Sequence, residues 1–280
     1  MNSALGKFFI GVAVRIPLIL WSLFVLYPLI WMFIGAFKSN GEIFASPWSI
    51  PESLHWSNFA TAWTKYNIQT SFMNSLFVTL VGTLLCLVFA IPTSYAIERV
   101  KFRGSAVLFN VYLASMMIPM VLGWIPLFFI LLHLNMLNNV WALSLIYAVT
   151  QIPFSIFILT SFMGSIPKEL EEAAAIDGMS QYGVLLKIIT PLTANGIITV
   201  SIMNSVTFWN EYFMALIFLQ TKEKQTLGVT MDLMNQEAQY TNDWGALFAG
   251  LSISVIPVII IYAIFQRRIM KGLTEGASKG

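Results

Sequence analysis

Residues 71–97 read SFMNSLFVTLVGTLLCLVFAIPTSYAI and contain no Asp, Glu, Lys or Arg. A helix of about 20 mostly apolar residues is long enough to span the hydrocarbon core of a bilayer. The apolar residues form a solid run and do not alternate with polar ones, so the pattern favours a membrane helix over a strand of a membrane barrel. Residues 71–97 are therefore predicted to form a transmembrane helix.

The composition of the whole chain points the same way. Of its 280 residues 10% are charged and 58% are hydrophobic, and the mean hydropathy is +0.77. A typical soluble domain has about 25% charged residues, so this chain has too little polar material to cover a surface that faces water. The net charge of +2 excludes a basic nucleic-acid-binding face. One cysteine and two histidines exclude a disulfide framework and a metal centre.

Five further stretches on either side of 71–97 are free of charge and long enough to cross a membrane. The six predicted spans are 16–37, 71–97, 106–132, 140–163, 188–210 and 244–266. The first exceeds the apolar core of a signal peptide, which is about 7–15 residues, and is predicted to be retained. Pro119, Gly123 and Pro126 predict a kink in the third. The predicted fold class is an all-α integral membrane protein with six transmembrane helices.

The basic residues predict the orientation of these spans, because short cytoplasmic loops collect Lys and Arg. With the N-terminus placed inside, eleven of the fifteen basic residues fall in inner segments and four in outer ones. The inner ones are Lys7, Arg15, Arg99, Lys101, Arg103, Lys168, Lys187, Arg267, Arg268, Lys271 and Lys279. Both termini are therefore predicted to be cytoplasmic, with residues 38–70, 133–139 and 211–243 outside.

The inner segment 164–187 differs from the other loops because a quarter of its residues are charged. Ser165 is a suitable N-cap for a helix whose first turn would hold three glutamates near its positive end. Gly178 suits a left-handed stop, and Ser180 suits the cap of a second short helix. The segment is predicted to form a helix–turn–helix hairpin at the inner membrane surface.

One face of the predicted hairpin helix suits docking of another protein. Leu170, Ala173, Ala174 and Asp177 share a face by helical spacing, and small side chains allow close approach of a second backbone. The alternative is an amphipathic connector that rests on lipid headgroups. The acids weigh against the connector, since helices that bind lipid surfaces are rich in Lys and Arg.

The hairpin carries a recognisable motif. Glu172-Ala173-Ala174, Gly178 four positions later, Ile188 and Pro191 resemble the EAA motif of membrane subunits of ATP-binding-cassette (ABC) importers, with Thr190 where leucine is usual. Residues 72–76, 95–104 and 209–212 resemble the sugar-importing branch of the maltose and multiple-sugar type. The resemblance implies a type I importer permease fold in the bacterial cytoplasmic membrane.

The resemblance also implies partners. Glu172, Ala173, Ala174, Asp177 and Gly178 would form a coupling helix that docks on a cytoplasmic ATPase. The complete importer would contain a second permease in a heterodimer, two ATP-binding subunits and an extracytoplasmic solute-binding protein. ATP and Mg would be bound by the ATPase, since this chain has no phosphate-binding G-x-x-x-x-G-K-[ST] motif of its own. No cofactor and no nucleic acid is expected on this chain.

A neutral sugar needs hydrogen-bonding groups and aromatic faces along its path, and does not need an ionic clamp. The candidate residues for the substrate path are Tyr147, Gln151, Asn204, Phe208, Trp209 and Asn210. Asn and Gln in membrane helices also bond neighbouring helices, which is the favoured role for Asn74. Glu211 has either a gating or hydrogen-bonding role or an ordinary surface role.

Two other classes of function are alternatives to an importer subunit. An ion-coupled secondary carrier of a small polar solute usually needs a buried charged residue, and none lies at mid-depth in the six spans. A membrane enzyme would need a nucleophile, base or metal motif, and none is present. The predicted organisation is an N-terminal span and outer loop (1–70), a transmembrane core with the cytoplasmic loop (71–266) and a cytoplasmic tail (267–280).

Overall fold

The computed structural model describes residues 4–277, with side chains described for residues 13–266. Every regular element in that part of the chain is a helix, which confirms the predicted all-α class. The chain divides into two compact units. One comprises Met1–Ile68 with Met231–Ile256, and the other comprises Gln69–Thr230 with Pro257–Gly280.

The candidate membrane spans are four continuous helices and two bent pairs of helices. The continuous helices are α1 (Ala4–Gly35), α4 (Ile68–Tyr95), α7 (Val140–Gly164) and α14 (Trp244–Ala277). The bent pairs are α5 (Ser105–Met116) with α6 (Trp124–His133), and a segment starting at α9 (Gln181–Val184) with α11 (Ala194–Trp209). The count agrees with the predicted six when each bent pair is taken as one span.

The third predicted span, 106–132, is broken and not merely kinked. α5 ends at Met116, and the chain turns by 94° before α6. Pro119 is extended, with ψ 119°, and a 3-10 turn over Met120–Gly123 follows it. Proline disfavours a helical conformation in the residue before it and donates no backbone hydrogen bond. The proline that predicted a kink therefore ends one helix and separates it from the next.

The fifth predicted span, 188–210, begins earlier and is also bent. It starts at α9, continues through a π-helical turn over Leu185–Ile189 and α10 (Thr190–Leu192), and bends by 75° before α11. The break falls at Thr193, whose hydroxyl donates to the carbonyl of Ile189 at 2.7 Å. This side chain bonds a carbonyl at the point where the regular helix stops.

The first unit contains short helices that the sequence analysis did not predict. They are α2 (Asn40–Ala45), α3 (Ser57–Thr64) and most of α13 (Leu227–Thr241). The Ser39 hydroxyl accepts from the backbone N–H of Glu42, and the Glu42 carboxylate accepts from the N–H of Ser39 at 2.7 Å. Hydrogen bonds from the backbone N–H of Glu52 and from Ser39 hold the pKa of the Glu42 carboxyl at about 2. This capping box fixes the start of α2.

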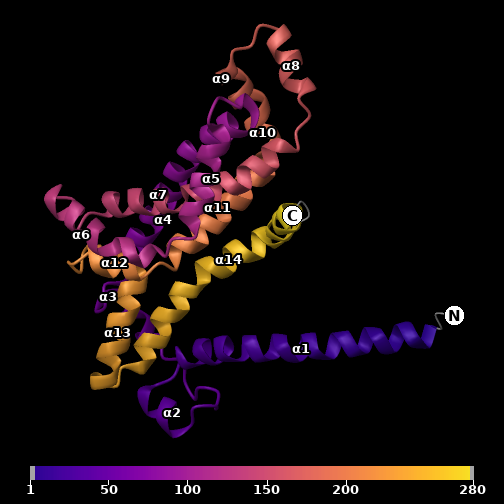
Figure 1. Ribbon diagram of the computed structural model, residues 1–280. Coiled ribbons are helices and arrows are strands. Elements are labelled where there is room, and N and C mark those ends of the chain that lie inside the picture. The colour runs from indigo at the N-terminus through magenta and orange to yellow at the C-terminus, as the bar shows by residue number, and fades with distance from the viewer. Residues whose placement is uncertain (1–3, 278–280) are drawn as a thin grey trace. The chain divides into compact units, whose positions relative to one another are not determined.

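The second unit is built around α7, which lies beside α11 (Figure 1). Tyr147 of α7 and Phe208 of α11 stack with ring centroids 5.2 Å apart. Gly196 allows the two helices to approach closely, because a Cβ at that position would lie 2.6 Å from Cγ of Phe162. The hairpin of α8 (Glu169–Ile176) and α9 lies at one end of this unit, and α6 and α12 (Phe213–Phe218) lie at the other (Figure 1).

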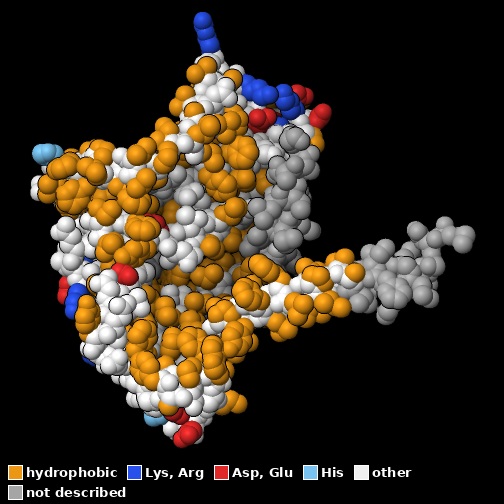
Figure 2. All heavy atoms as spheres, turned by 60° about the horizontal axis from the view of Figure 1, so that its bottom comes forward, with side chains coloured by type: hydrophobic (Ala, Val, Ile, Leu, Met, Phe, Trp, Pro, Cys, Tyr) orange, Lys and Arg blue, Asp and Glu red, His pale blue; other side chains and the backbone are white. Residues whose placement is uncertain are grey.

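The outer surface of the second unit is largely apolar. Leu80, Leu84 and Val88 recur every four residues along α4, and each is more than half exposed. Figure 2 shows hydrophobic side chains over much of the drawn face, with Lys, Arg, Asp and Glu side chains in small groups. An exposed apolar surface of this extent is expected where a chain meets lipid or another membrane subunit.

The predicted orientation of the chain stays a prediction. Several of the basic residues on which the orientation depends have side chains that the structure does not describe. They are Lys7, Arg267, Arg268, Lys271 and Lys279. The predicted tail continues the helix of α14 as far as Ala277. The predicted division of the chain at residues 70 and 266 concerns its topology across the membrane and also stays a prediction.

Gly196→Leu is expected to destabilise the second unit, because a larger side chain forces α7 and α11 apart. Overpacking of this kind costs about 1–3 kcal/mol. Thermal unfolding of the purified chain in detergent, followed by tryptophan fluorescence, measures the effect. Gly41→Leu in α2 is the matched control, because nothing lies within 4 Å of a Cβ at that position. An equal loss of stability in both variants would contradict the close α7–α11 packing.

Candidate functional site

The hairpin of segment 164–187 forms as predicted, apart from its first cap. α8 is preceded by Lys168 and not by Ser165, whose hydroxyl instead donates to the carbonyl of Phe162 at the end of α7. Gly178 has φ +78°, which confirms the left-handed stop. The Ser180 hydroxyl accepts from the N–H of Gly183 at 3.2 Å and begins α9.

The two sides of α8 differ in chemistry. Glu172, Ala173 and Asp177 are exposed, whereas Ala174 is 5% exposed. Ala174 packs in a cluster with Tyr95 and other apolar residues of the same chain. The predicted docking face is therefore corrected at one position: Ala174 lies on the inner side of α8, and its small size lets the helix pack against its own chain.

The outer side of the hairpin also carries apolar side chains. Ile176 is 87% exposed and Tyr182 is 79% exposed. With Glu172 and Asp177 they form a surface of mixed apolar and acidic character that nothing else in the described chain covers. Such a combination of exposed aromatic and aliphatic side chains with a charged surround is typical of a protein interface.

The inner side of the hairpin is fixed by an ion pair. The Arg99 guanidinium donates through Nε to the Glu171 carboxylate, and through Nη1 to the carbonyl of Ile166 at 2.9 Å. The Tyr95 hydroxyl also donates to the Glu171 carboxylate, at 3.3 Å. Two consecutive glutamates of α8 thus point to opposite sides: Glu171 faces the protein and Glu172 faces outward.

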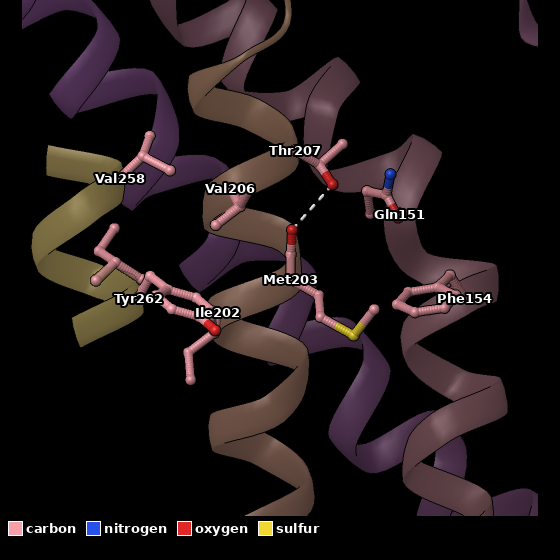
Figure 3. Close-up of a pocket in the computed structure, with 9 residues that line it drawn as sticks. Gln151, Phe154, Ile202, Met203, Val206, Thr207, Val258 and Tyr262 are labelled. Carbon is pink, nitrogen blue, oxygen red and sulfur yellow. Dashed lines mark hydrogen bonds between the residues drawn. The ribbon is translucent and has the colours of Figure 1, made fainter. Parts of the chain in front are cut away.

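A pocket of about 520 Å³ lies between α7, α11 and α14 within the second unit. Its nine lining residues are Gln151, Phe154, Ile202, Met203, Val206, Thr207, Val258, Ile261 and Tyr262. Figure 3 shows Gln151 pointing toward Thr207 and the ring of Phe154 directed at the sulfur of Met203. Since Gln151 lies near the middle of α7, the pocket is about halfway along that helix.

The pocket has the chemistry of a site for a neutral polar molecule. None of its nine lining side chains is charged, and its polar groups are the Gln151 amide and the hydroxyls of Thr207 and Tyr262. Thr207 donates to the carbonyl of Met203 at 2.9 Å, and its oxygen still has acceptor capacity. The aromatic rings of Phe154 and Tyr262 offer apolar faces.

The structure places only one of the six predicted path residues in this pocket. Gln151 lines it, whereas Tyr147, Phe208 and Trp209 are at most 7% exposed and pack inside the protein. Asn210 is exposed, and its amide donates to the carbonyl of Val206 at 2.8 Å. Membrane helices that are apolar on all sides do not reveal from their sequence which side faces inward.

Asn204 also lies outside the pocket, in a buried polar cluster that joins three spans. It is 1% exposed, and its amide donates to Ser155 Oγ of α7 at 3.1 Å and to Cys86 Sγ of α4 at 3.3 Å. Asn204 therefore bonds neighbouring helices, which is the alternative to a place on the substrate path. Asn74 bonds a loop and not a neighbouring helix, because its amide donates to the carbonyls of Glu223 and Gln225 in the segment before α13.

Glu211 is part of a structural cluster at the end of α11. The Tyr147 hydroxyl donates to its carboxylate. The same carboxylate accepts from the backbone N–H groups of Met214 at 2.8 Å and Ala215 at 3.1 Å. Glu211 therefore satisfies the first N–H groups of α12 and holds that short helix against α7. Of the two roles considered for Glu211, the structure favours the hydrogen-bonding one.

Sequence reasoning missed most residues of these sites, among them Thr207 and Tyr262 in the pocket and Arg99 and Glu171 at the hairpin. Thr207 and Tyr262 had no distinguishing signal, because threonine and tyrosine are ordinary residues of membrane helices. Arg99 was counted only as one of the cytoplasmic basic residues. Arg99 lies next to the end of a predicted span, and the charged segment 164–187 lies on the same predicted side of the membrane. These two features together would have indicated an ion pair.

Asn204→Ala is expected to lower the stability of the purified chain, because it removes the hydrogen bonds that join α11 to α4 and to α7. Interhelical bonds of this kind contribute about 0.6–2 kcal/mol. Gln151→Ala is the comparison, since that side chain lines the pocket and bridges no helices. Thermal unfolding in detergent separates the two. A larger loss of stability for Gln151→Ala than for Asn204→Ala would contradict these assignments.

Comparison with known proteins identifies the family. Residues 82–275 match the family model "Binding-protein-dependent transport system inner membrane component". The probable ABC transporter permease protein YurM of Bacillus subtilis (strain 168) is 35% identical over 98% of this chain and 91% of its own length. The diacetylchitobiose uptake system permease protein NgcG of Streptomyces coelicolor is 35% identical over 92% of this chain and 86% of its own.

The fold agrees with a solved transporter. The crystal structure of a bacterial ABC transporter involved in the import of the acidic polysaccharide alginate contains a chain with a TM-score of 0.83 and 26% identity. The match covers 95% of this chain and 98% of that one, which confirms the predicted importer-permease fold. The chain belongs to the family of binding-protein-dependent transport system inner membrane components, the multi-pass permeases of ABC importers.

Proposed function

We propose that this chain is the permease subunit of an ATP-driven importer for a neutral saccharide, such as a di- or oligosaccharide. The observation that carries the proposal is the uncharged pocket about halfway along α7, with Gln151, Thr207 and Tyr262 as its polar groups. Hydroxyls and amides match the hydroxyl groups of a sugar, and aromatic rings match its apolar faces. Two similar proteins support the class by their names, one for diacetylchitobiose and one for alginate.

The absence of charge in the pocket favours a neutral saccharide over an acidic one. A carboxylate moved into a low-dielectric site without a cation loses hydration worth several kcal/mol. None of the nine lining residues is Lys, Arg or His. The substrate of this chain is therefore proposed to differ in charge from the acidic polysaccharide of the structurally similar transporter.

The energy is proposed to come from separate ATP-binding subunits that dock on the hairpin of α8 and α9. Glu172, Ala173 and Asp177 present an exposed acidic surface, which suits a groove with basic groups on its rim. Gly178 makes the turn that returns the chain from α8 to α9. ATP and Mg are proposed to bind to those subunits, with this chain as a non-catalytic transport subunit.

The remaining partners are proposed from the family. They are a second permease that forms a heterodimer with this chain, and a solute-binding protein on the extracytoplasmic side. The family description itself specifies a binding-protein-dependent system. The ion-coupled carrier considered from the sequence is not favoured, since the family uses binding proteins.

Transport by the complete importer tests the substrate class. Proteoliposomes that contain ATP are expected to take up radiolabelled diacetylchitobiose or trehalose in the presence of the solute-binding protein. Gln151→Leu is expected to raise KM about 3–10-fold with little change in protein level, because one neutral hydrogen bond is lost. Equal uptake of an oligosaccharide of uronic acids, or uptake that follows an ion gradient without ATP, would contradict the proposal.

Substitution of Gly178 tests the docking turn. A Cβ there meets nothing within 4 Å, so the penalty arises from φ +78° and is greatest for a β-branched residue. Gly178→Val is expected to abolish ATP-dependent uptake while the chain still inserts, and Gly178→Asn is expected to retain much of it, since Asn tolerates this conformation. Co-purification with the ATP-binding subunit is the second readout. Full uptake by Gly178→Val with normal association would overturn the assignment.

A further inference from the structure

Arg99 lies where three parts of the second unit meet. It belongs to a π-helical turn over Ala96–Val100 that directly continues α4. Its side chain is 4% exposed and pairs with Glu171 of α8, which is 19% exposed. A buried guanidinium is stabilised by partners for its donors. Here Nε bonds a carboxylate and Nη1 bonds backbone carbonyls, while Nη2 is buried without a partner in the described part of the chain.

The same guanidinium also bonds the end of α7. Nη1 donates to the carbonyl of Ile166 at 2.9 Å and, more weakly, to that of Met163 at 3.4 Å. Carbonyls at the C-terminal end of a helix attract cations. One side chain therefore connects the end of α4, the end of α7 and the inner side of α8.

The chain connectivity shows why this connection matters for α4. α8 is joined to α7 by the four residues 165–168, and to α9 by the turn at Gly178. No such link joins α8 to α4, which precedes it by more than 70 residues. Contact between the end of α4 and the hairpin rests on Arg99, on the Tyr95 hydroxyl that donates to Glu171, and on apolar packing of Ile91 and Tyr95.

We propose that Arg99 is a positioning residue that transmits displacement of α8 to the cytoplasmic ends of α4 and α7. The proposal rests on the proposed docking of an ATP-binding subunit on the outer side of α8. When that subunit moves α8, the Arg99–Glu171 ion pair carries α4 along, and the carbonyl bonds carry α7. The planar fork of arginine bonds all these groups at once, which a lysine does not.

A merely structural role for Arg99 predicts a different result. Loss of a structural contact would lower the amount of folded protein and reduce every activity in proportion. If Arg99 transmits the displacement of α8, its loss leaves assembly and ATP hydrolysis intact. It removes only the change that ATP causes in the pocket between α7, α11 and α14. The informative measurement is therefore the effect of ATP on the pocket, per assembled complex.

A thiol in the pocket reports this response without knowledge of the substrate. Met203→Cys places the reporter at a lining position, and the native Cys86, which is 0% exposed, gives the background in the chain without the reporter. Complete importer in nanodiscs is labelled with a maleimide, with and without ATP and vanadate. With Arg99 intact, trapping is expected to change the labelling rate at least about fivefold.

Arg99→Gln and Glu171→Gln are each expected to reduce this change to less than about twofold, while the ATP-binding subunits still co-purify and hydrolyse ATP. Glu171→Gln leaves the bonds from Arg99 to the backbone carbonyls in place. If Arg99→Gln does not accumulate in the membrane, Glu171→Gln alone tests whether the ion pair transmits the displacement. Arg103→Gln is the matched control, because Arg103 is exposed and its loss removes the same charge. It is expected to respond like the unchanged chain.

Three results overturn the proposal: a full response in Arg99→Gln, a full response in Glu171→Gln, or loss of the ATP-binding subunits from either variant. The last result would make the pair part of docking and not of transmission. A separate outcome concerns the reporter chain in which Arg99 is intact. That chain could fail to bind ATP-binding subunits or fail to respond to ATP. Either failure would contradict the proposed function itself.

Discussion

Inside a membrane, every backbone N–H and C=O group must find a partner within the protein, because no water is available to it. Most of the structure follows from this constraint. The charge-free stretches are helical, and two of the spans are bent pairs of helices. At Thr193 the backbone N–H and the side-chain hydroxyl both donate to the carbonyl of Ile189. At Pro119 no backbone N–H is left without a partner, because proline has no backbone N–H. Buried polar side chains such as Asn204 likewise bond neighbouring helices.

Burial within the protein imposes a similar requirement on the charges at the hairpin of α8 and α9. Arg99 is almost fully buried, and it is stabilised by a carboxylate and by carbonyls at the end of α7. Its partner Glu171 adjoins Glu172, which faces outward on the same helix. One side of α8 is thus fixed to its own spans, and the other side is open to a second protein. A helix with this division of faces suits the transfer of movement from a cytoplasmic subunit to membrane helices.

The sequence was sufficient for features that depend on local chemistry. The apolar runs predicted the spans, Gly178 predicted the left-handed turn, and Ser180 predicted the second cap. It was insufficient wherever the answer depended on which side of a helix faces inward. Ala174 and Asn204 point into the protein, and Thr207 and Tyr262 line the pocket, because of packing between helices distant in sequence. The Ser39–Glu42 capping box was readable from its spacing but was not predicted.

The division of α8 into an inner and an outer side is the central claim, and two adjacent alanines test it directly. Ala173→Cys and Ala174→Cys make the same chemical change on the exposed and the buried position. In the assembled importer, a short reagent that links a thiol to a lysine amine is predicted to join position 173 to an ATP-binding subunit and to leave position 174 unreacted. Cross-linking from position 174 with none from position 173 would contradict the account.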